Sequence, residues 1–445
     1  MKTVLEHLRI IDEAADIYGA VVIEDGIIQD VIAADGQNHG EERLAPHRNT
    51  AARIIDGRMM RPGQVLTLMP ALVDLHAHFR DPGFPDKETL ESASLAAVAG
   101  GYGTVVCMAN TKAVIDTLEK AQVLKARSVR LGLIDLYPVM ALTQDMAGRV
   151  LSGITQVPAA PALPFPRMLS EDGRDVADDR LLLGAFREAR RLGLPVSCHC
   201  DAGGFEAEAA KRAGKPRELW SRIEENVATR RAIALGKQAQ CHVHIAHVST
   251  KEAVELIRET KATLNEAGGS FTLSCEATPH HLTLTEEDAC VLGAESWGRV
   301  NPPLRTEADR QALIAAILDG TIDAIATDHA PHTEADKIAG APGFTGLETG
   351  FAVARTELVR ADRLDLSRLS SLMSAAPARI LGLGDRGRIT PGNRADLIIV
   401  DSNALQLVNP GAFRSRGKNS PFEGQTLRGT VLMTLQRGRV VFEAP

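Results

Sequence analysis

The sequence predicts an α/β protein, with a (β/α)8 barrel in the middle of the chain and a small β-domain assembled from its two ends. Two observations support this prediction. Short apolar runs alternate with amphipathic helical patterns between about residues 69 and 384, and short apolar runs separated by turn residues make up both ends. The length of 445 residues suits one large domain with a smaller companion.

The two terminal zones, residues 1–68 and 385–445, have the period-two pattern of strands and hairpins. Examples are VVI at 21–23, ADLIIVD at 395–401 and TVLMTLQRGRVVFE at 430–443. Neither zone has enough strands to bury a core alone. We therefore expect the chain to leave one small β-domain and to return to it.

The middle zone, residues 69–384, is expected to form the metal-binding catalytic barrel. Its candidate strands are Leu72–Phe79, Thr104–Met108, Leu131–Tyr137, Arg167–Ser170, Leu194–His199, His242–His247, Phe271–Glu276 and Ile322–Thr327. Helical patterns between them include 87–100, 179–193 and 307–320. Repeated βα units indicate a parallel sheet, and eight of them favour a closed barrel. An open doubly wound sheet is the alternative, because periodicity does not separate the two.

Composition excludes several classes of protein. A net charge of −7 and a pI near 6.0 argue against general nucleic-acid binding, which requires a basic surface. No apolar run reaches the ~18 residues that a membrane span needs, and charged residues interrupt the start of the chain where a signal peptide is apolar. The six cysteines have no disulfide-framework spacing. We expect a cytoplasmic protein.

The first candidate strand ends in a pair of histidines, His76 and His78. Residues two apart in a strand point to the same face, so the two imidazoles can bind one metal ion. Asp74 shares that face one step deeper, and we expect it to orient a metal ligand without touching the metal. Alone, the pair is also compatible with surface histidines at a strand end.

Further candidate ligands lie at the ends of other strands, where a barrel builds its active site. They are His199, His247 and Asp328, together with one of the adjacent carboxylates Glu171 and Asp172. Imidazole nitrogen and carboxylate oxygen are ligands that zinc accepts. Four histidines and two carboxylates suffice for two metal ions that share a bridging carboxylate.

Strand alternation assigns other residues to packing. Cys198 and Cys200 flank His199 and should therefore point away from the face that His199 uses. By the same parity, His242 and His244 oppose His247, and we interpret them as packing histidines.

A two-metal site predicts hydrolytic chemistry, because two divalent ions activate a shared water and polarise a carbonyl. Asp328, at a strand end, suits the task of accepting the proton and passing it to the leaving group. Arg80 follows the histidine pair by two residues and can recognise a carboxylate. Together with Asn110, Asn301 and His332, it suggests an anionic, amide-containing substrate.

These motifs resemble dihydroorotases of the class I type, within the metal-dependent amidohydrolase superfamily. The resemblance spans nearly the whole chain. The motifs that carry it are DLHAHFRDPG at 74–83, MANT at 108–111, HVST at 247–250, NPPLR at 301–305, ATDHAPHT at 326–333, GLET at 346–349 and GKNSPFEG at 417–424. The resemblance implies a distorted (β/α)8, TIM-like barrel with a small β-sandwich domain built from both chain ends.

The resemblance also implies roles for single residues. Two Zn²⁺ ions per chain would be bridged by Asp172 and a hydroxide; His76, His78 and Asp328 would bind one ion, and His199 and His247 the other. Asp328 would be the general base and acid. Substrate would contact His78, Arg80, Asn110, Asn301, His332, Gly343 and Phe344. The implied reaction is the reversible cyclisation of N-carbamoyl-L-aspartate to (S)-dihydroorotate, in pyrimidine (UMP) biosynthesis. The implied partners are this small molecule, a second copy in a homodimer and aspartate transcarbamoylase.

Two alternatives accompany this interpretation. A hydantoinase or allantoinase is typically built around a carboxylated lysine, but no lysine occurs between Lys125 and Lys211. A non-catalytic scaffold for aspartate transcarbamoylase should have lost metal ligands, whereas all six candidate positions are filled here.

Overall fold

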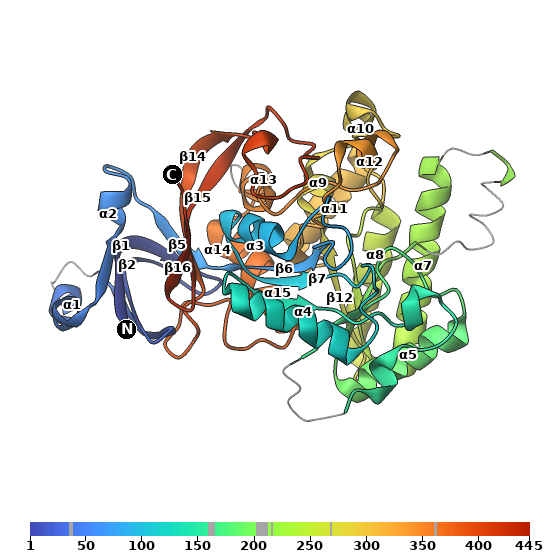
Figure 1. The fold of residues 1–445 in the computed structure, drawn as a ribbon, viewed down its shortest axis with the longest axis horizontal. Coiled ribbons are helices and arrows are strands. Elements are labelled where there is room, and N and C mark those ends of the chain that lie inside the picture. The colour runs from blue at the N-terminus through green and yellow to red at the C-terminus, as the bar shows by residue number, and fades with distance from the viewer. Residues whose placement is uncertain (35–38, 159–164, 202–211, 215–216, 268, 360–362) are drawn as a thin grey trace.

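The structure is a computed structural model that describes residues 1–34, 39–158, 165–201, 212–214, 217–267, 269–359 and 363–445. It has a β-rich end, where both termini lie, and a larger α/β barrel beside it (Figure 1). The predicted fold class is confirmed. Within the described part of the chain, no helix is both long and apolar enough to cross a bilayer.

The barrel contains a three-stranded and a five-stranded parallel sheet, in the orders β6-β7-β8 and β13-β12-β11-β10-β9. Isolated parallel bridges join the two sheets at Met140–Leu169 and Ala77–His329, so the ring of strands closes. The closed ring excludes the open doubly wound alternative. The strands are β6 (Leu72–Ala77), β7 (Tyr102–Cys107), β8 (Asp135–Pro138), β9 (Leu169–Ser170), β10 (Pro195–Cys198), β11 (His242–Ile245), β12 (Thr272–Ala277) and β13 (Ala324–Ile325).

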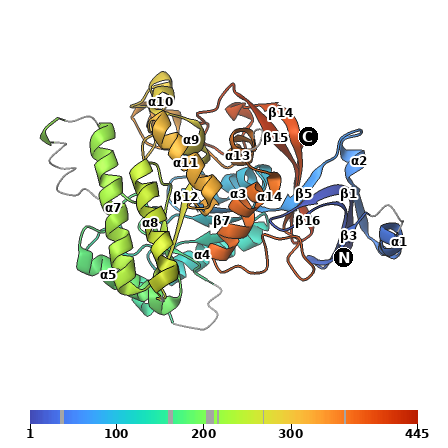
Figure 2. The same ribbon diagram turned by 180° about the vertical axis from the view of Figure 1, so that it is seen from behind.

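Helices surround the barrel, and α5, α7 and α8 cover the side far from the β-domain (Figures 1 and 2). The longer ones are α3 (Leu90–Ala99), α4 (Leu118–Leu131), α5 (Asp179–Leu192), α7 (Arg217–Ala239), α8 (Lys251–Ala267), α11 (Glu307–Asp319) and α13 (Gly350–Leu358). Shorter elements are η1 (Gln144–Met146), η2 (Gly153–Gln156), α9 (Pro279–Thr283), α10 (Glu286–Leu292), α12 (Glu334–Ile338), α14 (Leu366–Ser370), the π-helical turn η3 (Ser371–Ala375) and α15 (Ala376–Ile380).

The start of the third predicted strand is wrong. Leu131 is the last residue of α4 rather than the first of a strand. Gly132 ends that helix in the left-handed conformation, at φ 67°, and its N–H donates to the carbonyl of Ser128. The strand β8 therefore begins only at Asp135.

The β-domain joins both ends of the chain in one hydrogen-bonded sheet of order β16-β15-β14-β5-β1-β2-β3, with β4 beside β1. Its elements are β1 (Lys2–Ile11), β2 (Asp16–Glu24), β3 (Ile27–Ala33), α1 (His39–Thr50), β4 (Arg53–Asp56), α2 (Gly57–Met60), β5 (Thr67–Pro70), β14 (Leu397–Leu407), η4 (Pro410–Ala412), β15 (Thr426–Gln436) and β16 (Arg439–Glu443). The antiparallel pairing of β14 with β5 brings the C-terminal strands to the N-terminal ones.

The β-domain and the barrel share a core. Ile398, Val400 and Val431 from the β-domain belong to the same buried apolar cluster as the barrel strands and helices. The hydroxyl of Thr434 donates to the carbonyl of Val98, 2.7 Å away, at the end of α3. Burial of apolar surface between the two parts therefore fixes the barrel against the sheet.

A partly buried ionic cluster reinforces this junction at the start of β8. Asp135 accepts hydrogen bonds from Lys125 and, at 2.8 Å each, from Arg386 and Arg394 of the C-terminal segment. Burial alone would raise the pKa of Asp135, but the three cations outweigh it and hold the pKa well below its ordinary value. The cluster lies at the foot of the strand, at the opposite end from the strand termini that carry the candidate site.

We expect Asp135→Asn to lower the free energy of unfolding by about 3 kcal/mol, because it leaves three cations without their shared anion. Since the native pKa is depressed, this contribution is present above the unfolded-state pKa of about 3.9 and is lost as the pH falls below it. Urea denaturation measures the loss, with the exposed Asp86→Asn as control. Equal stability of the two variants near pH 7 would contradict the role given to Asp135.

Candidate metal centre

Six candidate ligands lie at the carboxyl ends of barrel strands. His76 belongs to β6 and His78 follows it, while the others follow the ends of β9, β10, β11 and β13. Parallel strands end on one side of a barrel, so the side chains converge there. All six side chains are buried, with at most 7% of any residue exposed: His76, His78, Asp172, His199, His247 and Asp328.

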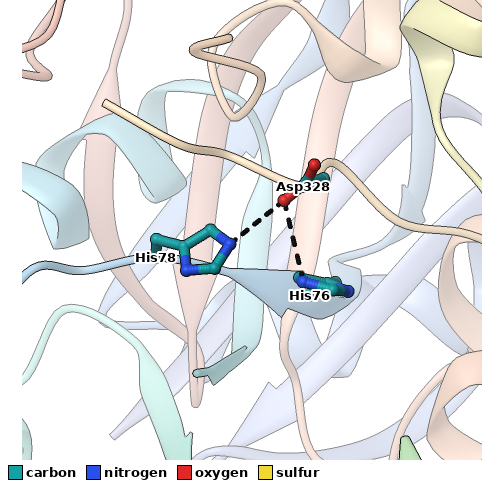
Figure 3. Close-up of side chains that lie close together, drawn as sticks. All are labelled: His76, His78 and Asp328. Atoms are coloured by element: carbon teal, nitrogen blue, oxygen red, sulfur yellow. Dashed lines mark hydrogen bonds and ion pairs between the residues drawn. The ribbon is translucent and has the colours of Figure 1, made fainter. Parts of the chain in front are cut away.

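The first group of donors joins β6 to the end of β13. One carboxylate oxygen of Asp328 lies 3.2 Å from Nε2 of His78 and 3.7 Å from Nε2 of His76 (Figure 3). One donor atom from each of the three residues lies within 4.8 Å of the others. This arrangement can hold one metal ion.

The second group is centred on Asp172. Its Oδ1 atom lies 3.0 Å from Nε2 of His76 and 3.9 Å from Nε2 of His247, and its Oδ2 atom lies 3.5 Å from Nε2 of His78. Burial would raise the pKa of Asp172, but the surrounding histidines outweigh it and hold the pKa well below its ordinary value. Asp172 therefore stays a carboxylate, the form that binds metals.

The neighbouring carboxylate points elsewhere. Glu171 accepts hydrogen bonds from the backbone N–H groups of Leu142 and Thr143, at 2.8 and 3.0 Å, and from the Thr143 hydroxyl. Of the two candidates left open by the sequence, only Asp172 faces the histidines.

His199 lies beside the two donor groups. Its ring contacts that of His247 edge-on, with 4.6 Å between the ring centroids, and Nδ2 of Asn301 lies 3.5 Å from its Nε2 atom. Asn301 also donates to Asp201 at 2.9 Å. The structure thus brings His199 next to His247, as a site for a second ion requires, but outside the two groups of closest donors.

Three buried atoms of this cluster support metal binding. Among the described residues, Nδ1 of His199 has no hydrogen-bond partner, and Nε2 of His76 and Oδ1 of Asp172, although 3.0 Å apart, form no hydrogen bond of suitable geometry. Leaving buried polar atoms unpaired is costly, and a metal ion satisfies lone pairs of this kind. Imidazole nitrogen and carboxylate oxygen are the donors that zinc prefers, so the residues fit a divalent ion.

A buried glutamate fixes the orientation of His76. Glu276, at the end of β12, accepts from Nδ1 of His76 at 3.1 Å and contacts Nε2 of His244 at 3.0 Å. Burial would raise the pKa of Glu276, but His244 and His76 lower it to about 2, so the group is ionised. With its Nδ1–H donated to Glu276, His76 turns the lone pair of Nε2 toward Asp172 and Asp328.

One sequence prediction is corrected here, and one is made more specific. Asp74 orients ligands through the backbone: it accepts from the backbone N–H of His76 and from the N–H and hydroxyl of Thr327, which precedes Asp328. His244 is more than a packing residue, because it contacts Glu276, and Ser274 Oγ links it to His242 at 2.8 and 2.7 Å. Glu276 was missed, although its position at a strand end was a signal that could have identified it.

Three residues at the site have strained backbones. Arg80, His247 and Asp328 have φ values of 56°, 30° and 47°, in the left-handed region that non-glycine residues rarely adopt. Such conformations cost about 1–3 kcal/mol each and persist where the surrounding structure enforces them. Because of these backbone conformations, the three side chains do not follow the alternation of side-chain directions that a regular strand has.

The predicted substrate-binding residues lie on two sides of the donor cluster. Asn110 contacts Nδ1 of His78 at 3.0 Å and donates to Asp172, so it also orients two candidate ligands. Arg80 donates to the carbonyl of Pro331, and its Nη2 atom lies 3.3 Å from Nε2 of His332. Burial and the positive charges of Arg80, Lys87 and Lys337 lower the pKa of His332 to about 3, so the ring is neutral and Arg80 is the cation in contact with it.

Gly343 and Phe344 belong to a loop beside His332. A Cβ atom on Gly343, which has a φ of +131°, would lie 2.5 Å from Cβ of Ala330 and 3.5 Å from Nε2 of His332, so only glycine fits. Phe344 is buried and packs edge-on against His280, with ring centroids 5.3 Å apart. The loop therefore forms a wall near His332.

Comparisons with known proteins agree with this geometry. Residues 67–441 match the model of the amidohydrolase family. A dihydroorotase of Clostridium botulinum (strain Eklund 17B / Type B) is 37% identical over 100% of both chains, and one of Pelotomaculum thermopropionicum is 37% identical over 93% of this chain and 94% of the other.

Solved structures of similar fold carry other names. L-hydantoinase (dihydropyrimidinase) from Arthrobacter aurescens has a TM-score of 0.81 and 25% identity, covering 99% of this chain and 96% of that one. Dihydropyrimidinase from Brevibacillus agri has a TM-score of 0.80 at 21% identity, with coverage of 100% and 95%. The second of these likenesses supports the fold alone.

We expect Glu276→Gln to weaken Zn²⁺ binding about 10- to 100-fold, because the amide presents only one acceptor to His76 and His244. Competition with a chromophoric chelator measures the affinity, and Glu259→Gln, an exposed change of the same kind on α8, is the control. An affinity equal to that of the unaltered chain would contradict the role of Glu276.

Proposed function

We propose that this chain, which belongs to the amidohydrolase family, is a dihydroorotase: it catalyses the reversible cyclisation of N-carbamoyl-L-aspartate to (S)-dihydroorotate with loss of water, a step of pyrimidine (UMP) biosynthesis. The observation that carries the proposal is the juxtaposition of Arg80, a carboxylate-binding group, with a buried cluster of histidines and carboxylates. The full-length similarity to dihydroorotases supports it.

We assign the ligands as the distances suggest. His76, His78 and Asp328 would hold one Zn²⁺ ion, and His199 and His247 the other. Asp172 would bridge them, since its carboxylate lies 3.0 and 3.5 Å from His76 and His78 and also 3.9 Å from His247. When bound, two divalent ions polarise the amide carbonyl and bring the pKa of water near neutrality.

Asp328 is proposed as the general base and acid. Its carboxylate lies against both His76 and His78, where a water attacking the ring carbonyl would be held. In the hydrolytic direction, Asp328 accepts the proton of that water and returns it to the ring nitrogen as the C–N bond breaks. In cyclisation the same proton moves in the opposite direction, from the nitrogen to Asp328 and then to the water that is lost.

Arg80 and His332 are proposed to bind the substrate carboxylate, with His78, Asn110, Asn301, Gly343 and Phe344 lining the pocket. A guanidinium recognises a carboxylate through paired hydrogen bonds. The proton of the neutral His332 ring lies on Nε2, 2.9 Å from the Pro342 carbonyl that accepts it, and this N–H would be shared with the substrate carboxylate. Asn110, engaged by His78 and Asp172, would couple this pocket to the metal ligands.

A hydantoinase is the nearest alternative, since the solved structures of similar fold include hydantoinases. Two observations favour a dihydroorotase. Identity to dihydroorotases reaches 37%, against 25% for the L-hydantoinase. In addition, Arg80 offers a charge for which a substrate without a carboxylate has no counterpart. The six filled ligand positions disfavour a non-catalytic scaffold.

The setting of the reaction is part of the proposal. We propose a cytoplasmic enzyme that forms a homodimer and associates with aspartate transcarbamoylase. Light scattering of the purified chain, alone and mixed with the transcarbamoylase, measures both assemblies.

We expect the purified enzyme to contain up to two zinc ions per chain and to hydrolyse dihydroorotate, but not hydantoin or allantoin. Metal analysis and three parallel assays give the result. Turnover of hydantoin or allantoin alone would contradict the proposed substrate. Fewer than about one ion per chain, without any dihydroorotate hydrolysis, would favour the scaffold.

We expect Asp328→Asn to keep the fold and at least one metal ion and to lose ~10²–10⁴-fold in kcat, the usual contribution of proton transfer. Metal analysis and steady-state kinetics test this. The control is Asp323→Asn, because Asp323 precedes the same strand at its opposite end and bonds to Lys261 and to the N–H of Cys275. Near-normal turnover by Asp328→Asn would refute the proposed base.

A further inference from the structure

The run GKNSPFEG at 417–424, between β14 and β15, crosses from the β-domain to the mouth of the barrel. Asn419, at its centre, is 2% exposed. The preceding Gly417 lies so close to Pro331 that a Cβ atom there would be 2.5 Å from Cβ of Pro331. A segment of the β-domain is thus in contact with the loop that carries His332.

The side chain of Asn419 bonds to two loops at once. Its Oδ1 atom accepts from the N–H of His332 at 3.0 Å. Its Nδ2 atom donates to the carbonyls of Ala330 and Gly343, at 3.0 Å each. The backbone carbonyl of Asn419 accepts from the N–H of Thr345 at 3.1 Å. One residue therefore ties the loop after β13 to the loop that contains Gly343.

A buried lysine holds the second loop from the other side. The Lys337 ammonium donates to the carbonyls of Arg299, Ala341 and Gly343, at 2.9, 2.9 and 3.0 Å. An ammonium has three N–H donors, so all of them are used. The Gly343 carbonyl receives one bond from Lys337 and one from Asn419, which fixes the orientation of that peptide group.

These bonds set the distance between the two walls of the proposed substrate pocket. The Pro342 carbonyl lies 2.9 Å from Nε2 of His332, and Gly343 fits against Ala330 only because it lacks a side chain. If the loop moved, His332 would lose this partner and the neighbouring Arg80 would lose its fixed position. None of the bonds of Asn419 goes to a candidate metal ligand.

We infer that Asn419 is a positioning residue for substrate recognition. Through it, the β-domain fixes the position of His332 relative to the loop that contains Gly343. This inference rests on the proposed function, because it concerns the pocket for the substrate carboxylate. It assigns a task to the GKNSPFEG run that neither metal binding nor proton transfer requires.

The test is Asn419→Ala in the full-length holoenzyme. The change leaves the N–H of His332 and the carbonyl of Ala330 buried without their partner, so both loops should loosen. We expect KM for dihydroorotate to rise about tenfold, since small displacements of positioning groups have effects of this size. Both kcat and zinc content should stay within about threefold of the unaltered enzyme.

Hydrogen–deuterium exchange gives a readout that does not depend on turnover. The amide of His332 should exchange faster in Asn419→Ala, because its acceptor is gone. The control is Asn409→Ala, an exposed asparagine on the same segment, whose side chain accepts only a local bond from Gly411 in the described structure. This control should match the unaltered enzyme in KM and in exchange.

Two results would overturn the inference: an unchanged KM in Asn419→Ala, or a rise in KM that is matched by Asn409→Ala. If Asn419→Ala does not fold, Asn419→Asp serves instead. It keeps the shape and the acceptor for His332 but replaces the donor to two carbonyls, and it should also raise KM; an unchanged KM again overturns the inference. An unaltered enzyme without dihydroorotate turnover contradicts the proposed function itself, a separate result.

Discussion

Burying four imidazoles and two carboxylates at one end of the barrel is the constraint on which the rest of the structure depends. Ionisable groups are costly to bury unless they are paired, hydrogen-bonded or bound to a metal. Here each carboxylate faces histidines, with Asp172 3.0 Å from His76 and Asp328 3.2 Å from His78. In the part of the chain that the structure describes, Nδ1 of His199 has no hydrogen-bond partner, and Nε2 of His76 and Oδ1 of Asp172 form no hydrogen bond of suitable geometry, so the donor set suits a cation.

The surrounding polar residues fix the orientations of these imidazoles and carboxylates through hydrogen bonds. A loosely packed core would leave the orientations free. Glu276 sets which nitrogen of His76 faces the cluster, and Asn110 does the same for His78. Asp74 and Thr327 hold the backbone just before Asp328. The opposite end of the barrel has a different role, since the partly buried carboxylate of Asp135 binds cations from α4 and from the C-terminal segment. The two ends thus separate chemistry from stability, as barrels commonly do.

Much of the fold and the convergence of the site could be predicted from the sequence, because polar residues at the ends of apolar strands must meet in a closed barrel. The orientations of the side chains at the site could not be predicted in this way. Parity predicted that His244 faces away from His247, but His247 follows the strand with a φ of 30°, where alternation no longer applies. Glu276 lies at a strand end, which marked it as a candidate, but its contacts with His76 and His244 join segments distant in sequence. The contacts of Asn419 are also long-range, and no local pattern points to them. The ligand roles and the domain boundaries stay predictions.

Overall similarity of fold does not decide the substrate in this family. The fold is similar to that of an L-hydantoinase, with a TM-score of 0.81 at 25% identity, whereas a dihydroorotase is 37% identical over the whole chain. The distinction has to come from the few side chains beside the metal donors. Burial disfavours the charge of the Arg80 guanidinium, and the carboxylates of Asp328, Asp172, Asp336 and Glu88 offset only part of that cost, because the pKa of Arg80 stays below its ordinary value. Under the proposed function, a bound carboxylate would offset the cost of holding Arg80 there in a left-handed backbone conformation. A substrate without that group would leave the cost in place, which would favour an acidic ring over a neutral one.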